Sequence, residues 1–131
     1  MARFTAVRDV RAPAPAVWDA LVDWPRHGDW VPLTVVRILT VRPGGVGARF
    51  VGRTGAGPLA FDDPMEVTAW QPPEGDRPGR CDVVKQGRVI GGSAWFSVAP
   101  LAAGRCRVAW HEDVTVTPHA VDTDGARVEV V

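Results

Sequence analysis

From residue 34 onward, hydrophobic and polar side chains alternate with a period of two, and clusters of glycine and proline interrupt the alternation at short intervals. Such alternation is typical of half-buried β-strands, and the clusters are typical of the turns between them. A similar alternation near the N-terminus adds one more strand, so the pattern predicts seven strands in all. They cover residues 4–11, 34–42, 47–54, 59–70, 80–89, 92–98 and 105–116.

Between the first two predicted strands the apolar residues recur at three- and four-residue spacing, which is typical of an amphipathic helix. Proline is tolerated just before a helix and in its first turn, so Pro13 and Pro15 favour a helix that covers residues 16–24. Trp24 precedes Pro25 and therefore avoids the α region, which ends this helix. A second short helical turn is expected at residues 26–29. Helices packed on an antiparallel sheet make an α+β fold.

Composition and charge exclude several classes of function. The 131 residues suit one domain, 1–131, with one core. Fifteen basic residues balance fifteen acidic ones, so no summed field attracts nucleic acid, and we expect no nucleic-acid partner. The apolar runs are far shorter than the roughly 20 residues of a membrane span, and the N-terminus carries no apolar signal core. We therefore expect no membrane span and a cytoplasmic protein.

The cysteines and histidines show no metal-binding spacing. Cys81 and Cys106 lie in neither a CxxC motif nor a Cys/His pattern, and we expect two reduced, buried thiols. His27, His111 and His119 are scattered along the chain, and His27 is expected to be a surface or capping residue. We therefore expect no metal and no other cofactor.

Three segments in this order resemble the START-like superfamily of helix-grip proteins, in particular its bacterial polyketide cyclase/dehydrase branch. They are DVRAPAPAVWDALVDWPRHGDWVP at residues 9–32, MEVTAWQPP at 65–73 and RVAWHEDV at 107–114. The resemblance implies a strongly bent seven-stranded antiparallel sheet wrapped around a long C-terminal helix, with a hydrophobic ligand cavity between them. It also implies roles that range from lipid carriage to ring cyclisation and dehydration, so the fold does not fix the function.

The C-terminal segment departs from the family pattern. Residues 117–131 carry proline, glycine and aspartates that break any helical stripe, so an irregular tail is expected and the grip helix is apparently missing. The concave apolar face would then lack its usual cover, and such faces are commonly covered by a partner. We expect a homodimer, or the tail itself, to cover it. A clean monomer in size-exclusion chromatography, together with no binding of a hydrophobic dye, would count against this expectation.

Glu112 is the candidate catalytic residue. If Val108 and Trp110 face the concave side of the last strand, alternation turns Glu112 the same way and turns His111 and Asp113 outward. Desolvation against an indole would favour the protonated carboxyl and suit it to act as a general acid or base in cyclisation or dehydration. Alternatively, Glu112 pairs with an arginine of a neighbouring strand or lies at a solvated strand end. If the strand alternation is shifted by one residue, His111 and Asp113 face the concave side and Glu112 faces outward.

Six tryptophans and no tyrosine are the unusual feature of the composition. Tryptophan supplies a large flat apolar surface, which suits either a core or the wall of a cavity. Trp18 and Trp24 lie on the helix stripe and are expected in the core, whereas aromatic residues on the strands are better candidates for the cavity wall. The predicted ligand-binding set is Trp30, Phe61, Met65, Trp70, Trp95, Phe96, Val108 and Trp110.

Asp62-Asp63-Pro64 lies within a predicted strand, where it is expected to form a kink or bulge rather than an acid–base pair.

The leading hypothesis for the function is binding of a small hydrophobic ligand, aromatic or polyketide- or lipid-like, in the concave face of the sheet. Two alternatives stay open: a polyketide cyclase/dehydratase that uses Glu112, and a non-enzymatic interaction protein whose apolar face docks another subunit.

Overall fold

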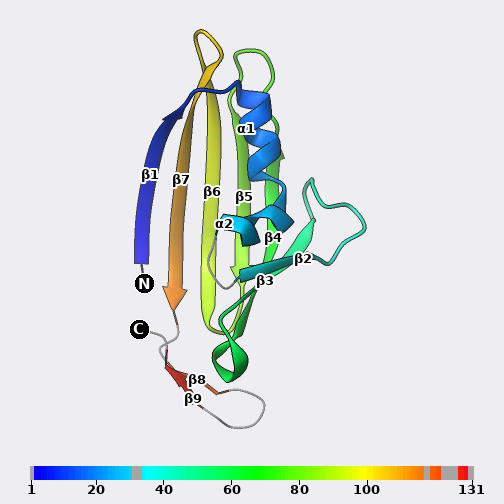
Figure 1. The fold of residues 1–131 in the computed structure, drawn as a ribbon, viewed down its shortest axis with the longest axis vertical. Helices are drawn as coiled ribbons and strands as arrows, with labels where there is room; N and C mark the ends of the chain where they lie inside the picture. The colour runs from blue at the N-terminus through cyan, green and yellow to red at the C-terminus, as the bar shows by residue number, and fades with distance from the viewer. Residues whose placement is uncertain (1, 31–33, 117–118, 122–126, 130–131) are drawn as a thin grey trace.

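The computed structural model describes residues 2–30, 34–116, 119–121 and 127–129 (Figure 1). Seven strands of this part of the chain form one antiparallel sheet in the order β1-β7-β6-β5-β4-β3-β2. Its strands are β1 (Ala2–Val10), β2 (Thr34–Ile38), β3 (Arg49–Thr54), β4 (Phe61–Gln71), β5 (Gly79–Gln86), β6 (Ile90–Leu101) and β7 (Arg105–Val116). The helices are α1 (Ala14–Leu21), η1 (Trp24–Arg26), α2 (His27–Trp30) and η2 (Gly57–Leu59). This α+β arrangement confirms the predicted seven-stranded sheet with short N-terminal helices.

Prolines set the limits of the helical segment. Helix α1 begins after Pro13 and carries Pro15 in its first turn, where the missing N–H has no helical partner. It ends at Leu21, three residues earlier than predicted, because Pro25 stands in the first turn of a separate 3-10 helix, η1. The break places Trp24 at the start of η1, with its ring buried rather than aligned on the stripe of α1.

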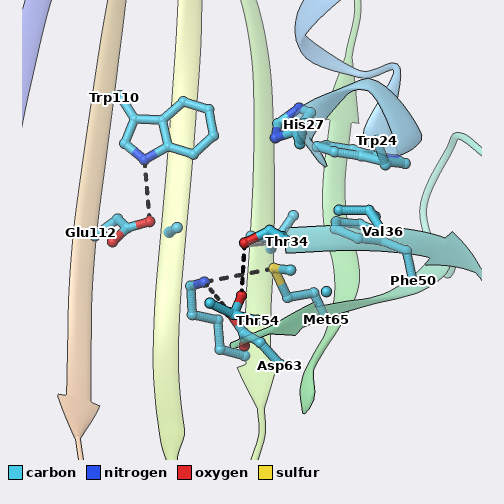
Figure 2. A pocket seen from close by; sticks show the side chains of 14 residues that line it. Trp24, His27, Thr34, Val36, Phe50, Thr54, Asp63, Met65, Trp110 and Glu112 are labelled. Carbon is cyan, nitrogen blue, oxygen red and sulfur yellow. Dashed lines mark hydrogen bonds and ion pairs between the residues drawn. The ribbon is translucent and has the colours of Figure 1, made fainter. Parts of the chain in front are cut away.

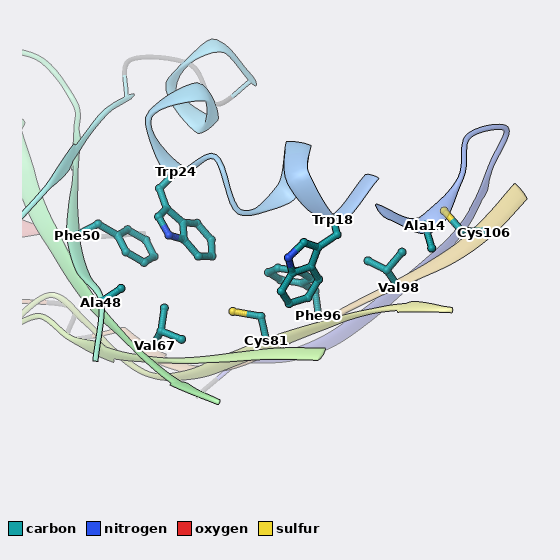
Figure 3. Packing of buried hydrophobic residues seen from close by; sticks show 10 residues of the cluster. All are labelled: Ala14, Trp18, Trp24, Ala48, Phe50, Val67, Cys81, Phe96, Val98 and Cys106. Atoms are coloured by element: carbon teal, nitrogen blue, oxygen red, sulfur yellow. The ribbon is translucent and has the colours of Figure 1, made fainter. Parts of the chain in front are cut away.

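The N-terminal helices α1, η1 and α2 cover one end of the concave face of the curved sheet (Figure 3). Helix α1 contacts β6 and β7, whereas η1 and α2 contact β2. The core between these layers is apolar and consists of Ala14, Trp18, Trp24, Ala48, Phe50, Val67, Cys81, Phe96, Val98 and Cys106. Within the described residues no helix is long and apolar enough to cross a membrane.

The sequence predicted a kink or bulge at Asp62-Asp63-Pro64, and the structure places the irregularity of this strand further along the chain. These residues pair regularly with β3, and the irregularity in β4 falls between Val67 and Ala69, where the register against β5 shifts. Pro64 pairs with Val51 of β3, and the pairing of β4 with β5 starts only at the next residue, so the proline lies at the end of one of the two ladders. A second distortion lies at Gly92 of β6, whose φ of 123° favours glycine.

The C-terminal segment was expected to be irregular, and its described residues form a separate two-stranded sheet of β8 (His119–Val121) and β9 (Arg127–Glu129). These strands lie beyond the end of β7 in Figure 1. The described part of the segment contains no helix. Residues 117–118, 122–126 and 130–131 of the predicted tail lie outside the described residues.

Candidate functional site

A cavity of about 260 Å³ lies on the concave face of the sheet, beside the aromatic core (Figure 2). Strands β2 to β7 and the segment from η1 to α2 all contribute to its wall. The wall is mainly apolar, and a few polar side chains converge on it. The lining residues are Trp24, His27, Thr34, Val36, Phe50, Gly52, Thr54, Asp63, Met65, Val83, Lys85, Ala94, Trp110 and Glu112.

Small residues explain why the sheet is hollow at this point. On the concave face of β6, Phe96 and Val98 fill the end beneath the helices, but Ala94 is the next inward residue along the strand. Gly52 of β3 also lies in the wall, and a Cβ atom there would meet nothing closer than the Cε of Met65 at 3.9 Å. Because side chains alternate between the two faces of a strand, these small residues leave space that their neighbours cannot fill.

Stacked aromatic rings close the cavity towards the helices. Trp24 is 2% exposed and stacks on Phe50 with the ring centroids 4.3 Å apart, and its Nε1 donates to the Pro43 carbonyl at 2.9 Å. Phe96 stacks in turn on Trp110 at 5.4 Å. The His27 ring lies 6.4 Å from that of Trp110, and its Nε2 donates to a main-chain carbonyl of α1. A flat apolar ligand would therefore meet flat surfaces that are already held in place.

A buried ion pair lies at the opposite side of the cavity. Lys85 Nζ lies 2.9 Å from Asp63 Oδ2, and the two side chains are 10% and 13% exposed. The same Nζ lies 3.7 Å from the sulfur of Met65. Asp63 Oδ1 is buried and has no hydrogen-bond partner among the described residues. An incompletely paired charge next to an apolar void is a common feature of ligand sites.

Glu112 lies in the cavity wall on β7, as strand alternation predicts. Its Oε1 accepts a hydrogen bond of 3.3 Å from the indole N–H of Trp110 (Figure 2). In the described part of the chain it forms no salt bridge, so the alternative of an arginine partner finds no support there. The carboxylate therefore lies in the cavity wall with the indole N–H as its partner.

The structure brings three predicted site residues, Met65, Trp110 and Glu112, into the cavity wall. Trp70, Phe96 and Val108 belong instead to the adjoining core and support the wall from behind. Phe61 pairs with Thr54 at the start of β4 but is not among the lining residues. The side chain of Trp30 lies outside the described residues.

The placement of Trp95 in the cavity wall was wrong. Trp95 directly precedes the inward-facing Phe96 and pairs with His111, so it lies on the convex face. There its ring stacks on that of His111 at 5.5 Å, and the guanidinium of Arg80 lies 4.2 Å from its centroid. Adjacent strand residues cannot both face the concavity, and Phe96 occupies the inward position.

Sequence reasoning missed several polar residues of the wall. No role was predicted for Lys85, Asp63 was predicted to lie in a turn or bulge, and His27 was predicted to be a surface or capping residue, but all three line the cavity. Strand alternation could have identified two of them, because residues two or four positions apart lie on the same face of a strand. Lys85 is two residues from Val83 and four from Cys81 on β5, and Asp63 is two residues from Met65 on β4.

The cysteines lie apart from the cavity and are unsuited to nucleophilic chemistry. Both thiols are free and buried. Burial raises the pKa of the Cys81 thiol to about 12, which keeps it protonated at neutral pH. Among the described residues no group of three histidine, cysteine, aspartate or glutamate side chains is arranged to hold a metal ion.

The chain matches a known family over nearly its whole length. The family model described as "Polyketide cyclase / dehydrase and lipid transport" matches residues 1–129. None of the curated proteins matches the chain in sequence.

Solved structures of the same fold come from bacteria and from humans. The Zhui aromatase/cyclase from Streptomyces sp. R1128 superimposes with a TM-score of 0.66 at 20% identity, over 96% of this chain and 73% of that one. A START superfamily protein from Mycobacterium smegmatis gives a TM-score of 0.69 at 17% identity, over 88% and 77%. The human StarD13 (DLC2) lipid transfer and protein localization domain gives 0.66 at 13% identity, over 90% and 64%. At sequence identities this low, the superpositions show that the fold is shared and show nothing further about this chain.

Proposed function

Because this chain belongs to the polyketide cyclase/dehydrase and lipid transport family, we propose that its concave cavity binds a small hydrophobic molecule with an aromatic or polyketide-like ring system. One observation carries the proposal: a mainly apolar cavity lies beside stacked aromatic rings, and a few polar side chains converge on it. Pockets of this kind bind organic ligands by apolar contact and orient them with the polar groups.

The size of the cavity narrows the class of ligand. A dry apolar cavity of about 150 Å³ is large enough for benzene. The cavity here, at about 260 Å³, therefore suits a molecule of about two fused rings. A long lipid chain would have to extend beyond it, so a compact ring compound fits the described site better than a lipid does.

A larger side chain at Gly52 would fill part of the cavity and is expected to weaken ligand binding strongly. The backbone of Gly52 does not have a positive φ, and a Cβ atom there would make only ordinary van der Waals contacts, the nearest at 3.9 Å from Met65 Cε. Because Gly52 is part of the cavity wall, a larger side chain would extend into the cavity. Gly52→Leu should lower the affinity for a bicyclic probe such as 2-naphthol about 100-fold, as isothermal titration calorimetry would measure.

Gly91 of β6 provides a matched control, because it is a strand glycine without positive φ and lies outside the cavity wall. Gly91→Leu should leave the dissociation constant within a factor of about two, well below the tenfold that 1.4 kcal/mol represents. Undiminished binding of 2-naphthol by a folded Gly52→Leu protein would place the ligand elsewhere and would refute the proposal.

A second candidate function is catalysis of cyclisation and dehydration, and the position of Glu112 in the cavity wall favours it. A suitable probe is 2-(2-oxopropyl)benzaldehyde. Removal of a proton from its methyl group, carbon–carbon bond formation at the aldehyde and loss of water yield 2-naphthol, whose fluorescence reports turnover. If Glu112 is the base, Glu112→Gln should lower kcat about 100-fold or more and leave the affinity for 2-naphthol unchanged. Equal turnover by both proteins would exclude this role.

A homodimer that covers the open part of the concave face stays a prediction. Phe4 of β1 pairs with Glu112 and therefore shares its face, and it is 49% exposed. An exposed phenylalanine beside a cavity supports a contact with a second copy of the chain, or with another subunit if the chain is an interaction protein.

A further inference from the structure

The ammonium group of Lys85 has hydrogen-bonding capacity to spare. It carries three N–H donors, whereas among the described residues its Nζ has one strong acceptor, Asp63 Oδ2, and one weak acceptor, the sulfur of Met65. The side chain is 10% exposed and forms part of the cavity wall. At least one N–H of Lys85 is therefore available to a bound molecule.

Asp63 has complementary unused capacity. Its Oδ1 is buried and has no hydrogen-bond donor in the described part of the chain, although buried carboxylate oxygens are normally paired. Lys85 occupies only one of the two lone pairs of Oδ2, so the carboxylate can accept a further proton donor while the ion pair stays intact. The pair thus offers both a donor and an acceptor at one end of an otherwise apolar hollow.

The charges around the cavity determine which ligand group suits this end. Asp63 and Glu112 contribute two carboxylates to the wall, against the single ammonium of Lys85. A ligand carboxylate would therefore add a third negative charge, which like-charge repulsion and desolvation both oppose. A neutral hydroxyl group donates one hydrogen bond and accepts others without adding charge.

We propose that Lys85 and Asp63 together recognise a neutral hydroxyl group, phenolic or enolic, on the ring system of the ligand. The hydroxyl oxygen accepts from Lys85 Nζ, and the hydroxyl proton is donated to the Asp63 carboxylate. This inference rests on the proposed function, since it assigns the polar end of the same cavity. It makes the ion pair a specificity determinant that selects oxygenated rings over hydrocarbons and over carboxylic acids.

Three bicyclic probes test the inference by titration calorimetry: 2-naphthol, naphthalene and 2-naphthoate. The wild-type protein should bind 2-naphthol at least about tenfold more tightly than either of the others. The double substitution Lys85→Met with Asp63→Leu replaces the ion pair with apolar side chains and should remove the preference for 2-naphthol over naphthalene.

The control is the nearby Arg53–Asp62 pair, which is 60% and 57% exposed and lies outside the cavity wall. Arg53→Met with Asp62→Leu should leave the preference unchanged. Equal binding of naphthalene and 2-naphthol by the wild-type protein, or tightest binding of 2-naphthoate, would overturn the inference while the proposed function stands. Failure of all three probes to bind would count against the proposed function itself.

Discussion

Replacing Lys85 with methionine is expected to lower the free energy of unfolding by about 3–5 kcal/mol. The substitution leaves the Asp63 carboxylate, now 13% exposed, without its 2.9 Å partner. Its other oxygen already lacks a hydrogen bond among the described residues, so no alternative pairing is in place. A buried, uncompensated charge is among the most destabilising changes that one substitution makes. Urea denaturation followed by circular dichroism would measure the loss.

Two further variants separate this effect from the loss of lysine packing. When Asp63→Leu accompanies Lys85→Met, no unpaired charge remains, and stability should return to within about 1–2 kcal/mol of wild type. Arg53→Met removes one partner of an exposed ion pair and should cost less than about 1 kcal/mol. If Lys85→Met alone unfolds at the wild-type urea concentration, the Lys85–Asp63 pair is not the buried interaction described above.

Trp24→Ala should be similarly costly and should also abolish ligand binding. The indole is 2% exposed, stacks on Phe50 and donates its N–H to the Pro43 carbonyl, so it joins η1 to β3 and to the loop between β2 and β3. Its removal should cost about 3–5 kcal/mol in stability. The cavity would also lose one of its flat walls. Denaturation and titration with 2-naphthol measure the two effects independently.

Trp95 on the convex face provides the comparison for Trp24. Its contacts with His111 and Arg80 are those of a surface cluster, and Trp95→Ala should cost about 1 kcal/mol and leave 2-naphthol binding unchanged. Trp24→Phe keeps an aromatic ring against Phe50 and loses the hydrogen bond to Pro43, so its stability should fall between those of wild type and Trp24→Ala. Equal losses of 2-naphthol binding in Trp24→Ala and Trp95→Ala would contradict the placement of Trp24, and not Trp95, in the cavity wall.

The architecture could be predicted from the sequence because each strand carries its own alternation and each turn its own glycine or proline. The same logic placed Glu112 and Trp110 on the concave face, since the assignment needed the parity of one strand alone. It failed for Trp95 because apolar residues occupy consecutive positions in β6, so composition could not distinguish the inward Phe96 from its outward neighbour.

Parity could place Lys85 and Asp63 on the concave face, but it could not predict that their side chains form an ion pair. The Lys85–Asp63 pair joins two strands, and its formation depends on the β4–β5 register, which shifts between Val67 and Ala69. Nothing in either strand alone marks that shift. The hollow itself is equally non-local, because it requires Gly52 of β3 and Ala94 of β6 to face the same space.

The most direct test of the central claim is a crystal structure of the protein grown with 2-naphthol. We predict electron density for the two rings beside Trp24 and Trp110, with the hydroxyl oxygen about 2.7–3.2 Å from Lys85 Nζ. A structure in which the protein's own side chains fill that space, or in which the naphthol binds outside it, would contradict the account.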